Sequence, residues 1–464
     1  MPGPQSAAAP AAALLFLGFL AGSAAAMTLV AVYDLLDLGP TVRDRHRKKC
    51  NLSSSSAGGG GGSGSEGGSL SKAPIPSFLE AMYLYEREIG LGEAIPSTPR
   101  NDGFRMPAEW EHHAGCWLLF PWRKDNWAHD AEPAQKAYAH VANAIQRHGN
   151  EQVTVGVRSE DWSVARALLN PAVRVVELGC DDAWVRDSGP TFVVKDDGEK
   201  EAREVRGVDW GFNAYGGIYE PCERDQLLAR KVLEVEGVRR YRAPVVMEGG
   251  SFHVDGEGTC IVTEECLLHP SRNPGLTKDE IEEGLKSYLN VDKVIWLELG
   301  VFGDEDTNGH VDNFCCFKGP GEVILHWTDD ENDPQFERSW SAFIRLTKEV
   351  DAKGRALRIH KMPMPGPLFY QEGDMEGLVL GEGRTKGRKV GSRMAASYVN
   401  YYLANEAVVV PQFMDIRDEE AIELLQLLYP ERKVVGVYSK DILLGGGNIH
   451  CITQQQPTNQ FDAF

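Results

Sequence analysis

The chain has 464 residues, of which 42% are hydrophobic and 25% charged, so it can bury the core of one large domain or of several. Its 48 basic and 68 acidic side chains give a formal charge of −20, which argues against a nucleic-acid-binding surface. This charge suits a cationic small-molecule ligand, and it is equally explained by solubility.

Nine cysteines are scattered along the chain, an odd number that indicates free thiols in a reducing compartment. Cys260, Cys266 and His269 lie close together, yet they lack the CxxC pairing of a zinc knuckle. Adjacent Cys315 and Cys316 would point to opposite faces of a strand. We therefore expect these residues to be structural, and we expect no metal site.

An apolar segment opens the chain. Residues 1–33 carry no charged side chain and Ala11–Tyr33 also lacks proline, so the stretch is long enough to cross a bilayer. A basic cluster at Arg43–Lys49 follows it, and the positive-inside rule then places the rest of the chain in the cytosol. Residues 1–50 are expected to be a membrane anchor or, because the stretch is alanine-rich, an organelle-targeting leader. The folded part is expected to be cytoplasmic or cytosol-facing.

Residues 51–103 separate this segment from the folded part. Ser53–Ser71 consists mostly of serine and glycine and has too few apolar groups to fold, which is typical of a flexible tether. A short helix is predicted around Phe78–Glu88. One folded domain is then expected over residues 104–457, with a C-terminal tail at residues 458–464.

Five amphipathic helices are predicted in the folded region, and each is followed by a β-type run. Hairpin turns, such as Asp197-Gly198 and Asn405-Glu406, precede most of the helices. The chain thus repeats one strand-strand-helix-strand unit five times, and such a unit cannot bury its apolar face alone. We expect an α/β fold in which the five units close into a ring. The predicted helices are Pro133–Gln146, Asp225–Val235, Thr277–Leu289, Phe336–Val350 and Asp418–Leu428.

The two ends of the folded region each offer a single β-type run. Ala114–Phe120 begins the first unit without a hairpin of its own, and Cys451–Gln455 lies near the end of the chain. The simplest closure pairs these two runs with each other.

Polar residues that are unusual for strands recur shortly before the hairpin turns. Asp187 lies in WVRDSGP, Glu248 in MEGGSFHVDGEG, and His310 and Asp312 in TNGHVDNF. Cys451 follows a run of three glycines in LLGGGNIHCITQQQP. If the units are related by pseudo-fivefold symmetry, these equivalent positions converge on one axis.

Each of these residues also has a purely structural explanation. Asp187 is adjacent to Arg186 and fits an ion pair, and Glu248 before two glycines fits a turn cap. His310 fits a satisfied loop histidine, and a lone buried cysteine such as Cys451 is usually inert. The recurrence of the polar positions in successive units is what favours a functional site.

A thiol, a histidine and three carboxylates fit the hydrolysis of a guanidine. A thiolate is a strong nucleophile when a nearby cation lowers its pKa, and a cationic substrate can supply that cation. Two carboxylates can hold a planar guanidinium through paired hydrogen bonds, with its carbon facing the sulfur. A histidine oriented by the third carboxylate can protonate departing ammonia and then activate water. Such a reaction proceeds through a covalent S-amidino intermediate.

Between Gly103 and Pro457 the chain closely resembles the agmatine deiminases, especially those of plants and algae. The resemblance rests on six runs in order: GFRMPAEWE, WVRDSGP, GVDWGFNAYGG, MEGGSFHVDG, TNGHVDNF and GGGNIHCITQQQP. It implies an α/β-propeller of five pseudo-symmetric ββαβ blades. It also implies conversion of agmatine and water to N-carbamoylputrescine and ammonia in polyamine (putrescine) biosynthesis, with no cofactor. A homodimer is expected by the same analogy.

The resemblance also implies a role for each matching residue. Cys451 is then the nucleophile, His310 the general acid and base, and Glu248 the carboxylate that partners the histidine. Asp187 and Asp312 match the pair that holds the guanidinium. Trp184 and Tyr215 fall in matching motifs, and we expect them to line the substrate channel.

Three other functions remain open from the sequence. A peptidylarginine or free-arginine deiminase would keep the chemistry but, for free arginine, need a cationic partner for the α-carboxylate. An amidinotransferase would pass the amidino group to an amine instead of water. A non-catalytic propeller that binds a polyamine or a partner protein would have no need of Cys451.

Overall fold

The computed structural model describes residues 94–196, 203–379 and 387–459. The expected anchor or leader, most of the linker with the Phe78–Glu88 helix, and the Asp197-Gly198 turn lie outside these ranges. No helix within them combines the length and the hydropathy that crossing a membrane requires. Packing begins ahead of Phe104, because Ile95 is already buried and its amide donates to the carbonyl of Arg240.

Five separate sheets hold the named strands, and one order recurs in all of them. An antiparallel pair of strands is extended by a parallel strand, and the first sheet carries one further parallel strand. The sheets contain, in order, β16 (Gln454–Pro457), β1 (His113–Leu119), β2 (Gln152–Val157) and β3 (Arg174–Glu177); β4 (Thr191–Asp196), β5 (Arg203–Gly211) and β6 (Arg240–Val246); β7 (Phe252–Val254), β8 (Thr259–Thr263) and β9 (Lys293–Leu297); β10 (Cys315–Gly319), β11 (Glu322–Trp327) and β12 (Arg358–Pro363); β13 (Tyr402–Leu403), β14 (Ala407–Gln412) and β15 (Lys433–Tyr438).

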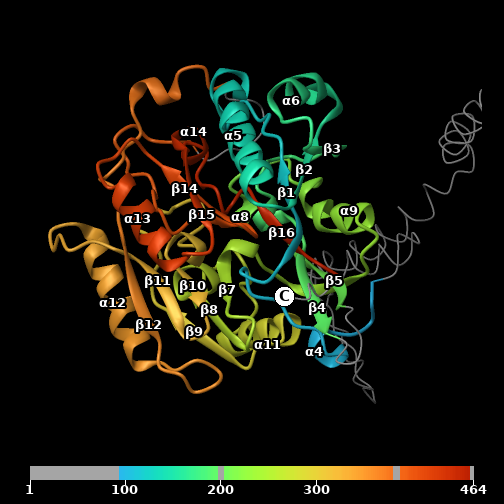
Figure 1. The fold of residues 1–464 in the computed structure, drawn as a ribbon, viewed down its shortest axis with the longest axis vertical. Helices are drawn as coiled ribbons and strands as arrows, with labels where there is room; N and C mark the ends of the chain where they lie inside the picture. The colour runs from blue at the N-terminus through green and yellow to red at the C-terminus, as the bar shows by residue number, and fades with distance from the viewer. Residues whose placement is uncertain (1–93, 197–202, 380–386, 460–464) are drawn as a thin grey trace, which may run out of the picture. The chain divides into compact units, whose positions relative to one another are not determined.

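The five predicted helices are confirmed, and each connects two parallel neighbours of one sheet. Parallel strands need such a crossover because their ends to be joined lie at opposite edges. The helices lie on the outside of the strands (Figure 1). Their bounds are α5 (Glu132–His148), α9 (Leu228–Val235), α11 (Lys278–Leu289), α12 (Pro334–Lys348) and α13 (Asp418–Leu428). Thr277 caps α11 in a reciprocal pair with Glu280, as its sequence predicts. Helix α6 (Trp162–Leu168) and β3 were not predicted.

The predicted pairing of the two ends of the folded region is confirmed. Strand β16 runs antiparallel to β1, with Gln454 opposite Trp117. The predicted start of this last strand was wrong, since Cys451 lies in a turn and β16 begins only at Gln454. Side chains of a strand alternate between the two faces of the sheet. Because Cys451 lies in a turn, this alternation does not set the direction of its side chain.

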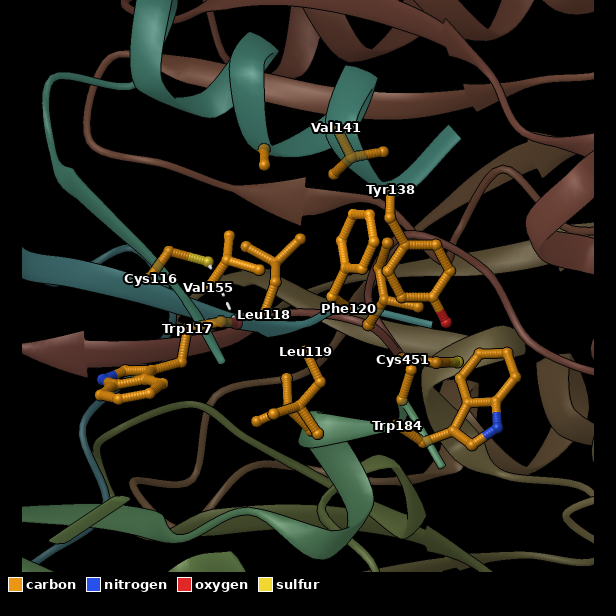
Figure 2. Close-up of a cluster of buried hydrophobic side chains, with 14 of the residues drawn as sticks. Cys116, Trp117, Leu118, Leu119, Phe120, Tyr138, Val141, Val155, Trp184 and Cys451 are labelled. Carbon is orange, nitrogen blue, oxygen red and sulfur yellow. Dashed lines mark hydrogen bonds between the residues drawn. The ribbon is translucent and has the colours of Figure 1, made fainter. Parts of the chain in front are cut away.

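The fold is mixed α/β, and within the described ranges the five sheets are not hydrogen-bonded into one closed sheet. The largest hydrophobic cluster lies between α5 and the first sheet and includes Trp117, Leu119, Phe120 and Tyr138. Cys451 belongs to the edge of this cluster, where Figure 2 shows it beside the indole of Trp184. The core that closes the ends of the folded region therefore also supports the candidate nucleophile.

Candidate active site

Short helical turns, not strands, carry the predicted acidic residues. Asp187 lies in α7 (Val185–Ser188) ahead of β4, Glu248 precedes the turn η5 (Gly249–Ser251) ahead of β7, and Asp312 lies in η6 (Val311–Asn313) ahead of β10. The strand assignment of these residues was wrong. A turn of helix leaves backbone donors unpaired, and carboxylates can accept from them, as Asp187 does from the amide of Gly250 at 2.9 Å.

Cys451 occupies the equivalent place ahead of β16, with a side chain that is 2% exposed. The amide nitrogen of the Asn400 side chain lies 3.2 Å from its sulfur, and Asp312 Oδ2 lies 3.6 Å away. Gly447 makes room for this arrangement. A Cβ there would lie 2.7 Å from the Trp184 ring and 3.2 Å from the Cys451 sulfur, so a larger residue would push the thiol away.

The two aspartates of the predicted guanidinium pair have different surroundings. Tyr215 donates its hydroxyl to Asp187 at 2.9 Å, and burial raises the pKa of Asp187 to about 6. Burial also favours the neutral form of Asp312, but the hydrogen bond and charge of His450 outweigh it and lower the pKa of that carboxyl. Asp312 thus stays charged to lower pH than Asp187 does.

His310 is fully buried between two carboxylates. Its Nδ1 lies 3.7 Å from Asp187 Oδ1, and its Nε2 lies 3.5 Å from Glu248 Oε2. Burial opposes the charged imidazolium, but the charge of Asp187 and the neighbouring carboxylate of Glu248 outweigh it and raise the pKa of His310 well above its ordinary value. A histidine in this state holds a proton that it can donate.

The thiol of Cys451 is protonated in the site without substrate. Burial raises its pKa well above the ordinary value, and the negative charges of Asp312 and Asp187 add to this effect. A cation bound between these carboxylates would oppose the increase. The site therefore favours ionisation of the sulfur only when a positively charged ligand is present.

A pocket opens onto the sulfur and encloses about 440 Å³ of empty space, its mouth included. Four predicted residues line it, namely Cys451, Asp187, Trp184 and Tyr215. Asp312, Glu248 and His310 are more deeply buried and contact the lining residues. The rest of the lining is Asn126, Asp182, Ile218, Tyr219, Asp306, Thr307, Arg388 and Gly445–Gly447.

Arg272 and Asn400 are among the functional candidates that were missed at the level of sequence. Arg272 donates to Glu248 Oε1 at 2.8 Å and fixes that carboxylate beside His310. Asn400 bonds the nucleophile from the turn ahead of β13, the same place in its unit that the acidic residues and Cys451 occupy in theirs. The position of Asn400 just ahead of the first strand of its unit could have indicated it from the sequence. Arg272 occupies no equivalent position, and only its burial in the structure distinguishes it.

Two groups of described residues bring potential metal-binding atoms within 4.8 Å of one another. The first contains Glu248, Cys266 and His310, and Arg272 donates to its carboxylate, so a cation is already paired there. The second contains Glu109, His253 and His450 and lies behind Asp312.

Comparisons with known proteins show the family of the chain. The model of the Porphyromonas-type peptidyl-arginine deiminase family matches residues 105–457. The agmatine deiminase of Pseudomonas aeruginosa (strain UCBPP-PA14) is 54% identical over 367 residues, which cover 78% of this chain and 97% of that protein. The agmatine deiminase of Ectopseudomonas mendocina is 52% identical over 372 residues, covering 79% and 99%.

Solved structures give the same result. The structure of the agmatine deiminase of Enterococcus faecalis superposes with a TM-score of 0.75 at 44% identity, covering 79% of this chain and all of that one. The chain therefore belongs to the Porphyromonas-type peptidyl-arginine deiminase family. Within it the chain is a member of the agmatine deiminases, which are hydrolases of carbon–nitrogen bonds.

Proposed function

We propose that the protein hydrolyses agmatine to N-carbamoylputrescine and ammonia, a step of putrescine and polyamine biosynthesis. One observation carries the proposal. The thiol of Cys451 and Asp187 line one pocket, while Asp312 lies 3.6 Å from the sulfur and His310 lies 3.7 Å from Asp187. This set fits a planar cation whose central carbon is attacked by sulfur.

The first half of the reaction forms the covalent intermediate. Asp187 and Asp312 accept N–H bonds from the guanidinium, and the bound positive charge promotes loss of the thiol proton from Cys451 to solvent. The thiolate attacks the guanidinium carbon. His310 donates its proton to one amino nitrogen, the carbon–nitrogen bond breaks, and ammonia leaves. The remaining carbon is then bonded to sulfur as an S-amidino group.

The second half releases the product. His310, now neutral, accepts a proton from water, and the water oxygen attacks the amidino carbon. The carbon–sulfur bond breaks and its electron pair returns to Cys451 as the thiolate. The hydroxyl group on the carbon loses its proton to this thiolate, which forms the urea carbonyl of the product and restores the thiol. Glu248 holds His310 in place in both halves because Arg272 fixes that carboxylate. No metal or cofactor has a role in these steps.

The pocket walls favour agmatine over arginine. Asp182 lines it beside Trp184, and this carboxyl group and indole suit the amine end of agmatine. Arg388 also lines the pocket and is the one described feature that favours an arginine carboxylate. Its guanidinium is already paired with Asp306 and donates to the carbonyl of Gly445 at 2.5 Å. An arginine substrate would have to compete with these partners.

Ammonia release from agmatine, arginine and an arginyl peptide tests this assignment. We expect release from agmatine alone, and release from arginine or the peptide instead would support the arginine deiminase alternative. An amidinated acceptor without free ammonia would indicate transfer to an amine. Cys451→Ser should bind agmatine and lose turnover, whereas Cys180→Ser, which replaces another buried cysteine of the same cluster, should turn over normally.

Mass spectrometry of acid-quenched enzyme and agmatine tests the intermediate directly. We expect an amidino adduct on the peptide that contains Cys451. Turnover without any adduct on this residue would contradict the covalent mechanism.

Several finer assignments belong to the same proposal. Residues 104–457 form the catalytic domain as a five-bladed ββαβ propeller, which the repeated order of the five sheets supports. The motif runs favour the plant and algal subgroup.

The domain works as a homodimer on the cytosolic side, and residues 1–50 anchor or target it. Alkaline carbonate extraction tests the anchor, and full release of the intact chain would exclude it. Sedimentation tests the dimer.

A further inference from the structure

Three sequence motifs meet beside Asp312, and the residues they contribute do not line the pocket. Glu109 comes from GFRMPAEWE, His253 from MEGGSFHVDG and His450 from GGGNIHCITQQQP, and all three side chains are at least nine-tenths buried. We call these residues the buried triad. His450 is the neighbour of Cys451 in the chain, while Glu109 lies 341 residues away from it.

Both ring nitrogens of His450 face a carboxylate. Nδ1 lies 2.9 Å from Asp312 Oδ2, and Nε2 lies 2.8 Å from Glu109 Oε1. An ionised carboxylate only accepts hydrogen bonds, so an imidazole that satisfies two of them must carry a proton on each nitrogen. His450 also holds the nucleophile's turn, since Asn400 Oδ1 accepts its backbone N–H at 3.0 Å.

We propose that His450 is a positioning residue that keeps Asp312 charged and directed toward the guanidinium. Glu109 keeps the ring of His450 in the imidazolium form. This role rests on the proposed function, because Asp312 matters to the reaction only if a guanidinium binds. His253 supports Glu109 from a third side. The amide of Phe317 donates to His253 Nδ1, so its proton is on Nε2, 3.5 Å from Glu109 Oε2.

The electrostatics of the cluster agree with this protonation. Burial and the nearby Arg186 oppose the charged imidazole, yet Glu109 and Asp312 raise the pKa of His450. Burial also opposes the ionised form of Glu109, but His450 and His253 hold the pKa of Glu109 well below its ordinary value. Other titratable or charged groups that face the triad or Asp312 are Arg186 from α7, Asp187, His310, Cys316 from β10, Tyr429 after α13 and Cys451.

A metal ion is the competing explanation for a glutamate flanked by two histidines. Two observations disfavour it. Glu109 Oε1 already accepts from His450, and the guanidinium of Arg186 lies 3.6 Å from the same oxygen. A second cation would have to displace the ring proton and sit beside Arg186. The triad therefore binds protons in preference to a metal.

The steady-state constants of two variants test the role of His450. His450→Asn keeps a side-chain donor for Asp312 but removes the charge, and Glu109→Gln removes the anion that holds the imidazolium. Because Asp312 contacts the guanidinium before and during the reaction, we expect each variant to raise KM for agmatine about tenfold or more. We expect kcat to change by less than about threefold.

His113→Asn is the matched control. His113 also forms a buried pair with a glutamate, since its Nδ1 lies 3.2 Å from Glu151, but neither residue lines the pocket. We expect this variant to lower the melting temperature and to leave KM unchanged. If folded His450→Asn and Glu109→Gln keep the wild-type KM, or lose only kcat or stability, the proposal is wrong.

A spectroscopic measurement on the wild-type protein decides the protonation state without relying on any variant's activity. In the protein with ¹⁵N-labelled histidine rings, we expect both His450 nitrogens to show N–H signals from about pH 6 to 8. The signals are assigned by their loss in His450→Asn or, if that variant does not fold, by their shift in Glu109→Gln. If only one ring nitrogen of His450 carries a proton in this pH range, the proposal is wrong. If wild-type enzyme releases no ammonia from agmatine, the proposed function fails while this measurement still judges the triad.

Discussion

Asn400 donates its side-chain amide to the sulfur of Cys451 at 3.2 Å, although 51 residues separate them. Both residues occupy the turn ahead of the first strand of their sheet, as Asp187, Glu248 and Asp312 do in theirs. Each of the five sheets thus contributes one such turn to a single site. A residue that bonds the sulfur from the fifth turn is expected to act on the thiolate.

Asn400→Ala should lower kcat/KM about 10- to 100-fold, because the thiolate loses a hydrogen bond and the site is buried. Asn400→Asp should slow the reaction further, since a second carboxylate beside the sulfur raises the thiol pKa. The rate of alkylation of Cys451 by iodoacetamide as a function of pH measures this pKa. Asn143→Ala removes a bond to the carbonyl of Leu168 in another part of the fold and should leave the alkylation rate unchanged.

Gly250→Ala should lower kcat about 100-fold or more. A Cβ at this position would lie 2.6 Å from His310 Nδ1, 2.8 Å from Asp312 Oδ2 and 2.9 Å from Asp187 Oδ1, so all three groups would have to move. A displacement of about 1 Å in a catalytic group costs about 100-fold in rate. A methyl group on Gly275 would meet no atom within 4 Å, so Gly275→Ala is the control and should keep normal kcat. Normal kcat in folded Gly250→Ala would show that these groups need no fixed spacing.

The pH dependence of kcat/KM should report Asp187. Burial raises the pKa of this acid to about 6, so its charged form dominates only above that pH. A protonated Asp187 cannot hold a cation, and kcat/KM should therefore fall as the pH decreases through about 6. At saturating agmatine, kcat should fall at a lower pH than kcat/KM does, because the bound cation favours the carboxylate form of Asp187. If kcat/KM instead fell only near the ordinary pKa of a carboxyl group, this assignment would be wrong.

Removal of the chain after Asn448 should reduce stability as well as activity. The truncation exposes the edge of β1 and removes Ile449 and Ile452, whose side chains are fully buried. Each buried isoleucine contributes about 1.5–3 kcal/mol, so the melting temperature should fall by several degrees. Cys451→Ser keeps these residues and should lose activity alone. A chain that ends at Asn459 retains β16 and serves as the control; equal melting temperatures for both truncations would show that β16 adds no stability.

Local patterns were sufficient for the repeating elements of the fold. The bounds of α13 agree with the prediction residue by residue, because apolar periodicity and flanking turns specify such segments. The same patterns failed at the site. His310 and Asp312 are spaced like neighbours on one face of a strand, and the structure places them around a short helical turn instead.

The sequence by itself determined the five repeated units, the pairing of the two ends of the folded region and the residue types that suit guanidine chemistry. These features depend on periodicity and on motifs read within short windows. Only the tertiary structure decided that Asn400 reaches the sulfur, that Arg272 fixes Glu248, and that Glu109 and Asp312 hold His450 between them. Such contacts join residues that are distant in the chain, and the contact with His450 is what lowers the pKa of Asp312, while burial raises that of the chemically identical Asp187.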